Sequence, residues 1–153
     1  MIYNILSFLF VLPIIFIVII DLKYFIIPNL YILWLIFVGI CNIFIFKTYF
    51  NQVLGILFSF VIFLLLYLLF PKGIGFGDVK LAGAIGLFLG LKLTILAILL
   101  SFLSGAVVGL LLIALHKKSM KDPIPFGPFL AFGAIASLFF GEYIIDWYLN
   151  LFL

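Results

Sequence analysis

The chain contains few charged residues, one cysteine, one histidine and no arginine. Only 8% of its 153 residues are charged, whereas 69% are hydrophobic. A water-soluble domain needs much more polar surface than this composition supplies, so we exclude a separate soluble domain. All eight basic residues are lysines. Their small excess over acidic residues suits short loops beside a membrane better than a nucleic-acid interface, and we exclude nucleic acid as a partner.

The scarcity of cysteine and histidine limits the metal and disulfide chemistry of the chain. Cys41 is the only cysteine, so neither an intrachain disulfide nor a paired-cysteine metal site can form. His116 stands beside Lys117 and Lys118, with no second histidine to complete a set of ligands. We therefore predict no metal site and interpret Cys41 as a small lipid-facing or packing residue.

Long apolar segments occupy most of the chain. Charged residues, prolines and glycines divide it into six of them, near residues 2–20, 30–46, 53–70, 79–91, 93–115 and 127–149. A membrane-spanning helix needs roughly 20 mostly apolar residues. We therefore predict an all-α membrane protein with about six transmembrane helices in one bundle, forming a single domain over residues 1–153. Because the fourth segment is short, we expect the residues before it to form a partly submerged loop.

The lysines are distributed unevenly between the two sides that six crossings define. The connections at 21–28, 71–78 and 116–126 would share one side. That side carries Lys23, Lys72, Lys80, Lys117, Lys118 and Lys121, whereas the other carries Lys47 and Lys92. Cytoplasmic loops are rich in lysine, so we predict that the first side is cytoplasmic. A re-entrant segment 79–91 is an alternative, but it moves three lysines and removes this bias.

Two acidic residues stand at the ends of apolar segments on the predicted cytoplasmic side. Asp21 ends the first segment and Asp78 precedes the fourth. A carboxylate at membrane depth is costly unless it faces a polar cavity or a partner, so two on one side suggest a pair. In such a pair one carboxyl keeps a proton, and the two can act as acid and base in peptide hydrolysis. Either residue could instead be a helix cap or an interfacial side chain.

Three glycines precede Asp78 in the string GIGFGD, residues 73–78. Glycine allows left-handed backbone and close backbone approach, and an ordinary loop does not need three of them beside a carboxylate. A phosphate-binding loop is a competing interpretation, but it requires a preceding β-strand and a following Lys and Ser or Thr. Lys80 and Lys23 could each pair with a neighbouring aspartate or could contact only lipid headgroups.

Three motifs follow one another along the chain. They are IDLKYFIIPN at residues 20–29, GIGFGDVKLAGAIGLFLG at 73–90 and IPFGPFLAFG at 124–133. In this order they resemble the motifs of the type IV prepilin peptidases, which are membrane aspartyl proteases with a GxGD motif. The resemblance implies that Asp21 and Asp78 are the catalytic residues.

The resemblance also implies supporting roles for residues beside the two aspartates. Gly75 and Gly77 match the glycines of the GxGD motif. Pro28 and Asn29 match the turn that follows the first aspartate, and Lys80 belongs to the second motif.

Membership of this family would imply cleavage of the short basic leader of pilin-like precursors at the cytoplasmic face of the cell membrane. The partners would be these precursors and membrane lipid. Many bacterial members also methylate the new N terminus with S-adenosylmethionine and carry a cytoplasmic insertion with paired cysteines. This chain has no cysteine pair and few residues between Asp21 and the second segment. We therefore predict a minimal peptidase without methyltransferase activity and without a cofactor.

Other functions remain as alternatives at this point. Presenilin-type proteases pair Tyr-Asp with a later Pro-Ala-Leu, and neither string occurs here. A small transporter or channel subunit could use Asp21 and Asp78 as proton or ion sites. A structural subunit with a decayed active site is disfavoured because both aspartates are intact.

Overall fold

The computed structural model describes residues 1–70, 73–117, 119 and 122–152 of the chain. These residues form five helices: α1 (Ile2–Tyr24), α2 (Asn29–Phe46), α3 (Tyr49–Leu69), α4 (Phe76–Ala114) and α5 (Gly127–Phe152). By length and composition, all five are able to cross a membrane. The prediction of an all-α membrane protein is confirmed, and the chain is a multi-pass membrane protein.

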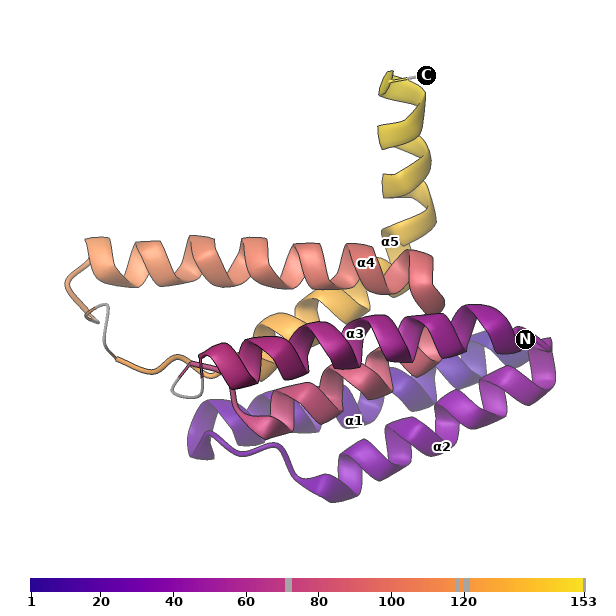
Figure 1. Ribbon diagram of the computed structural model, residues 1–153, viewed down its shortest axis with the longest axis horizontal. Helices are drawn as coiled ribbons and strands as arrows, with labels where there is room; N and C mark the ends of the chain where they lie inside the picture. The colour runs from indigo at the N-terminus through magenta and orange to yellow at the C-terminus, as the bar shows by residue number, and fades with distance from the viewer. Residues whose placement is uncertain (71–72, 118, 120–121, 153) are drawn as a thin grey trace.

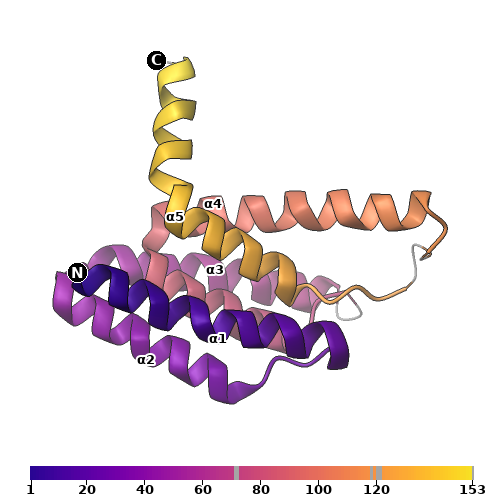
Figure 2. The ribbon, with the colours of Figure 1, turned by 180° about the vertical axis from the view of Figure 1, so that it is seen from behind.

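The predicted fourth and fifth segments belong to one interrupted helix, α4. Gly90 has non-helical backbone angles, with φ at 74° and ψ at 174°, in the interior of this 39-residue helix. Figures 1 and 2 show that α4 folds back on itself, so that its two parts run in opposite directions. The expected number of about six helices is therefore close to the five observed, and the difference is this interruption.

Side chains from α2, α3 and α4 itself form hydrogen bonds with the backbone around the break at Gly90. The Asn51 side-chain oxygen accepts a hydrogen bond from the Leu91 N–H at 3.1 Å, and the Asn42 amide donates to the Phe88 carbonyl at 3.0 Å. The Thr94 hydroxyl donates to the Gly90 carbonyl. Irregular backbone at membrane depth persists only where other groups satisfy it in this way.

The first part of α4 forms the centre of the bundle. Nearly every residue from Asp78 to Gly90 is buried, and the ring of Phe88 stacks on that of Phe10 in α1 with centroids 4.1 Å apart. α3 packs closely against this part. The two backbones are so near at Gly55 that an added Cβ would lie 2.4 Å from the Gly86 carbonyl oxygen. Small residues of this kind let helix backbones approach where lipid supplies no hydrophobic driving force.

The end of α1 and the starts of α2, α4 and α5 lie at the same end of the bundle, opposite the N terminus (Figures 1 and 2). The structure thus places the 21–28 connection and the start of α4 on one side, as predicted. Lys72, Lys118 and Lys121, which contributed to the lysine count, lie outside the described residues.

Candidate active site

Asp21 lies in the last turn of α1 with its side chain buried. Only 5% of its surface is exposed. The helix ends at Tyr24 because Phe25 adopts a left-handed conformation, with φ at 56°, and its N–H donates to the Asp21 carbonyl at 2.9 Å. This left-handed cap is a common way to end a helix. The chain turns away at Phe25, four residues after Asp21, and the Asp21 carboxyl stays buried in the bundle.

Asp78 lies in the first turn of α4, and 7% of its surface is exposed. Its Oδ2 accepts a hydrogen bond from the N–H of Gly75, the N-cap residue, at 3.0 Å. A carboxylate at the third helical position commonly caps the free N–H groups of a helix start. No group in the described chain bonds to the other oxygen, Oδ1, which is also buried. Buried polar atoms without a partner are uncommon in folded proteins, and contact with a water molecule or a substrate would satisfy this oxygen.

A third segment, the start of α5, completes the surroundings of Asp21. The N–H of Gly127 donates to Asp21 Oδ2 at 3.0 Å. A Cβ at Gly127 would lie 2.5 Å from that oxygen, so a larger residue does not fit without displacement. Gly127 lies inside the third motif at 124–133, but nothing in that motif distinguishes it as a contact of Asp21.

The two carboxyl groups line the same two cavities. One, of about 300 Å³, lies between the 25–29 connection and the first turn of α4. The other, of about 190 Å³, lies between residues 73–78 and 123–126. Asp21 and Asp78 belong to the walls of both. The structure therefore brings together the two aspartates that sequence reasoning paired, at the meeting point of all three motifs.

Lys80 and Asn29 form a contact across the larger cavity. The Lys80 ammonium donates to the Asn29 side-chain oxygen at 3.0 Å and lies 5.1 Å from the centre of the Phe76 ring. This bond links the start of α2 to the N-terminal part of α4, and both residues line the cavity. The lysine thus bonds to Asn29, not to a neighbouring aspartate as one interpretation of the sequence had it. Pro28 is the N-cap of α2, in an extended conformation.

The GxGD segment differs from its expected loop structure. The motif does not lie on a loop, because Gly75 is the N-cap of α4 and Phe76 its first residue. Its glycines also do not adopt left-handed backbone, since Gly90 is the one described glycine with a positive φ. Gly77 is required for close packing instead, because a Cβ at this position would lie 3.1 Å from the Ile27 Cβ.

The described residues contain no group of three or more His, Cys, Asp and Glu side chains that could hold a metal ion. The chemistry that the site offers on its own is that of a carboxyl pair. When two carboxyls share a cavity, one can hold a proton while the other is ionised, which provides an acid and a base together.

Residues 8–110 match the protein family described as the type IV leader peptidase family. The chain is 38% identical over 108 residues to the prepilin leader peptidase/N-methyltransferase of Aeromonas hydrophila, an alignment that covers 67% of this chain and 37% of the relative. The protein of the same name from Pseudomonas aeruginosa is 38% identical over 102 residues, with 66% and 35% covered. The alignments span little more than a third of these relatives. No solved structure matches the chain.

Proposed function

Because the chain belongs to the type IV leader peptidase family, we propose that it is an aspartyl endopeptidase of the membrane that cuts leader peptides from pilin-like precursors. One observation carries this proposal above all others. Asp21 and Asp78, which come from different helices, line the same cavities, and the buried Asp78 Oδ1 has no hydrogen-bond partner in the described chain. The family match favours hydrolysis over the alternative of an ion or proton transport site.

In the proposed reaction the two carboxyls act as one unit that carries a single proton. The ionised carboxyl takes a proton from a water molecule, whose oxygen attacks the carbonyl carbon of the scissile peptide bond. The protonated carboxyl donates a hydrogen bond to the carbonyl oxygen, where negative charge develops. The proton taken from water then passes to the leaving nitrogen, and the C–N bond breaks. Asp78 Oδ1 is the atom that we assign to contact with water or substrate, because Oδ2 is engaged by Gly75.

The glycine N–H groups hold the carboxyls in position for this reaction. Each Oδ2 accepts one such bond, from Gly127 at Asp21 and from Gly75 at Asp78. Fixed backbone donors restrict rotation of the carboxyl groups, and catalysis depends on such fixed geometry. The same bonds leave the other oxygen of each carboxyl without a glycine N–H partner.

The proposed substrate has a basic leader in water and an apolar helix in the membrane. Asp21 lies in the last turn of α1 and Asp78 in the first turn of α4, and these two helix ends lie at the same end of the bundle (Figure 1). A peptide bond at the junction of leader and helix would therefore reach both carboxyls at that end. We assign this end to the cytoplasmic face of the cell membrane, on the ground that six of the eight lysines fall there in a six-crossing arrangement. The chain would act there as a single membrane domain, with precursors and lipid as its partners.

The names of the relatives join peptidase and N-methyltransferase activities. We assign only peptide hydrolysis to the residues of this site and retain the prediction that it transfers no methyl group and needs no cofactor. Purified protein that is given a precursor and labelled S-adenosylmethionine should release the leader without labelling the new N terminus. Label on the cut product would contradict this assignment.

Cleavage by the purified protein in lipid vesicles tests the proposal. A precursor with a basic leader should be cut once, at the end of the leader, as mass spectrometry of the products will show. Asp21→Asn and Asp78→Asn should each abolish the cut. Glu142→Gln, which removes an exposed carboxylate on α5 that pairs with Lys92, is the matched control and should leave cleavage intact. Cleavage at the normal rate by both aspartate variants would overturn the proposal.

A further inference from the structure

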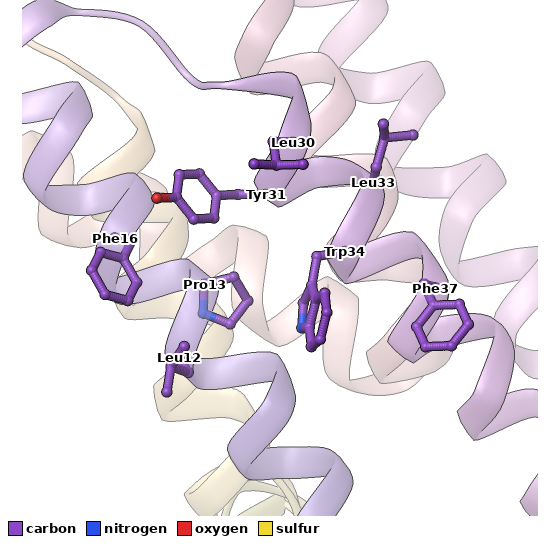
Figure 3. A pocket seen from close by; sticks show the side chains of 8 residues that line it. All are labelled: Leu12, Pro13, Phe16, Leu30, Tyr31, Leu33, Trp34 and Phe37. Carbon is purple, nitrogen blue, oxygen red and sulfur yellow. The ribbon is translucent and has the colours of Figure 1, made fainter.

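A groove of about 560 Å³ runs between α1 and α2 on the surface of the bundle. Figure 3 shows its side chains, which include Leu12, Pro13 and Phe16 from α1 and Tyr31, Trp34 and Phe37 from α2. Most of them are aromatic or branched aliphatic. The groove faces the lipid, because Leu12, Phe16, Trp34 and Phe37 are all exposed on helices that span the membrane.

Two contacts fix the walls of this groove. Pro13 has no N–H and leaves the Leu9 carbonyl without its usual helical partner, and the Trp34 indole N–H donates to that carbonyl at 3.1 Å. The rings of Phe16 and Tyr31 stack with centroids 5.8 Å apart and planes 4° apart. The aromatic walls are therefore held from both helices and need little ordering when a ligand binds.

The groove lies next to the carboxyl pair. Asn29 lines the larger carboxyl cavity, and the next two residues, Leu30 and Tyr31, line the groove. On α1, Phe16 precedes Asp21 by five residues, which is about 8 Å along a helix axis. Since an extended chain advances roughly 3.3 Å per residue, at least about three extended residues would connect a helix in the groove to the carboxyls.

A second lipid-facing cavity has the wrong position for this role. It is lined by residues near the start of α1, among them Tyr3 and Ser7, and by Leu138 of α5. Tyr3 is 18 residues from Asp21, which is about 27 Å along the helix. A helix bound there would begin at the opposite end of the bundle from the carboxyls.

We propose that the α1–α2 groove binds the apolar helix of the precursor while its leader extends past Asn29 to Asp21 and Asp78. This inference rests on the proposed function. Leu30 and Phe37 both line the groove and are seven residues apart, so the groove follows α2 for two helical turns. A docked helix repeats the side chains on one face at the same spacing. In lipid, van der Waals packing against such preformed walls drives helix association.

Kinetics with two substrates test the inference. One substrate is a full precursor in vesicles, and the other is a short peptide that contains the leader and the cleavage junction but no apolar helix. Leu33→Trp fills the groove, and Leu65→Trp places the same bulk at an exposed position on α3. The ratio of the precursor KM to the peptide KM should rise about tenfold for Leu33→Trp. For Leu65→Trp it should keep its wild-type value.

Crosslinking provides a second measurement that does not depend on turnover. A photoreactive phenylalanine analogue replaces Leu33 in the Asp78→Asn background, with the precursor present in vesicles. An adduct to the apolar helix of the precursor supports the inference. Adducts to lipid alone, or an unchanged KM ratio for Leu33→Trp, overturn it and leave the proposed function standing. If the wild-type protein cuts neither substrate, the proposed function fails, and this inference fails with it.

Discussion

The backbone N–H of Gly127 donates a hydrogen bond to Asp21 Oδ2 at 3.0 Å, across 106 positions of the sequence. An equivalent bond joins Gly75 to Asp78 Oδ2 at the start of α4, also at 3.0 Å. Each of the two aspartates is therefore held by one glycine N–H. The Gly127 bond connects the third motif to the first. The orientation of the Asp21 carboxyl therefore depends on the position of α5.

Replacing Gly127 with alanine should reduce cleavage with little loss of folded protein. The new Cβ would lie 2.5 Å from Asp21 Oδ2, so the carboxyl or the start of α5 has to move. A displacement of about 1 Å at a reacting group can lower the rate about a hundredfold. The measurement is kcat on a precursor in vesicles.

Gly109→Ala is the matched control for that variant. Its Cβ would have Ile124 Cδ1 as its nearest neighbour at 3.9 Å, an ordinary contact. We expect its kcat to stay near that of the wild type. Equal activity of the Gly127 and Gly109 variants would contradict a positioning role for Gly127.

Lys80 and Asn29 should be energetically coupled. Their hydrogen bond joins the N-terminal part of α4 to the start of α2 beside the carboxyls. A double-mutant cycle of Lys80→Met and Asn29→Leu should give a coupling free energy of about 1 kcal/mol in unfolding measurements, as expected for one partly exposed charge-assisted bond. Lys23→Met with Asn29→Leu is the control cycle, because the Lys23 ammonium lies instead over the Tyr24 ring. Additive effects in the first cycle would show that the bond contributes no stability.

Gly90→Ala should destabilise the protein strongly. At φ 74° and ψ 174° the backbone is in a region that is essentially restricted to glycine, and an added Cβ would lie 2.3 Å from Asn51 Nδ2. We expect the free energy of unfolding in detergent to fall by about 3 kcal/mol or more, since strain and displacement of the Asn51 cap act together.

Gly83→Ala, in the same buried part of α4, separates this effect from a general intolerance of bulk. Its Cβ would lie 3.6 Å from the nearest atom, Phe60 Cδ2, which is ordinary contact. The two variants should therefore differ clearly in unfolding free energy. Similar values would show that the conformation of Gly90 is not what requires glycine there.

Hydropathy and motif spacing predicted the membrane helices and the aspartate pair, because apolar length and costly intramembrane carboxylates are both visible in a sequence. The division predicted between the fourth and fifth segments, at Lys92, lies two residues from the interruption at Gly90. Its cause was not predictable, since nothing in the sequence separates Gly90 from the neighbouring Gly83 and Gly86. Only the fold shows which of them has a positive φ.

The other differences between the sequence-based expectations and the structure arise from contacts within the fold. The interpretation that paired Lys80 with a nearby aspartate considered sequence neighbours, whereas its partner Asn29 is 51 residues away. The shortness of the fourth apolar segment predicted a loop at the GxGD segment, yet Asp78 lies in the first turn of α4 and caps its start. Gly127 acts through its backbone N–H, which every residue except proline possesses, so its side chain gave no signal.

The most direct test of the carboxyl pair is the kcat of Asp21→Asn, Asp78→Asn and the double variant on one precursor in vesicles. Residues that act as a unit are strongly non-additive, so each single variant should lose about a thousandfold or more, and the double variant should be no slower than the slower single one. Circular dichroism should show the wild-type helix content in all three. A single variant that cleaves within about tenfold of the wild-type rate would contradict the account.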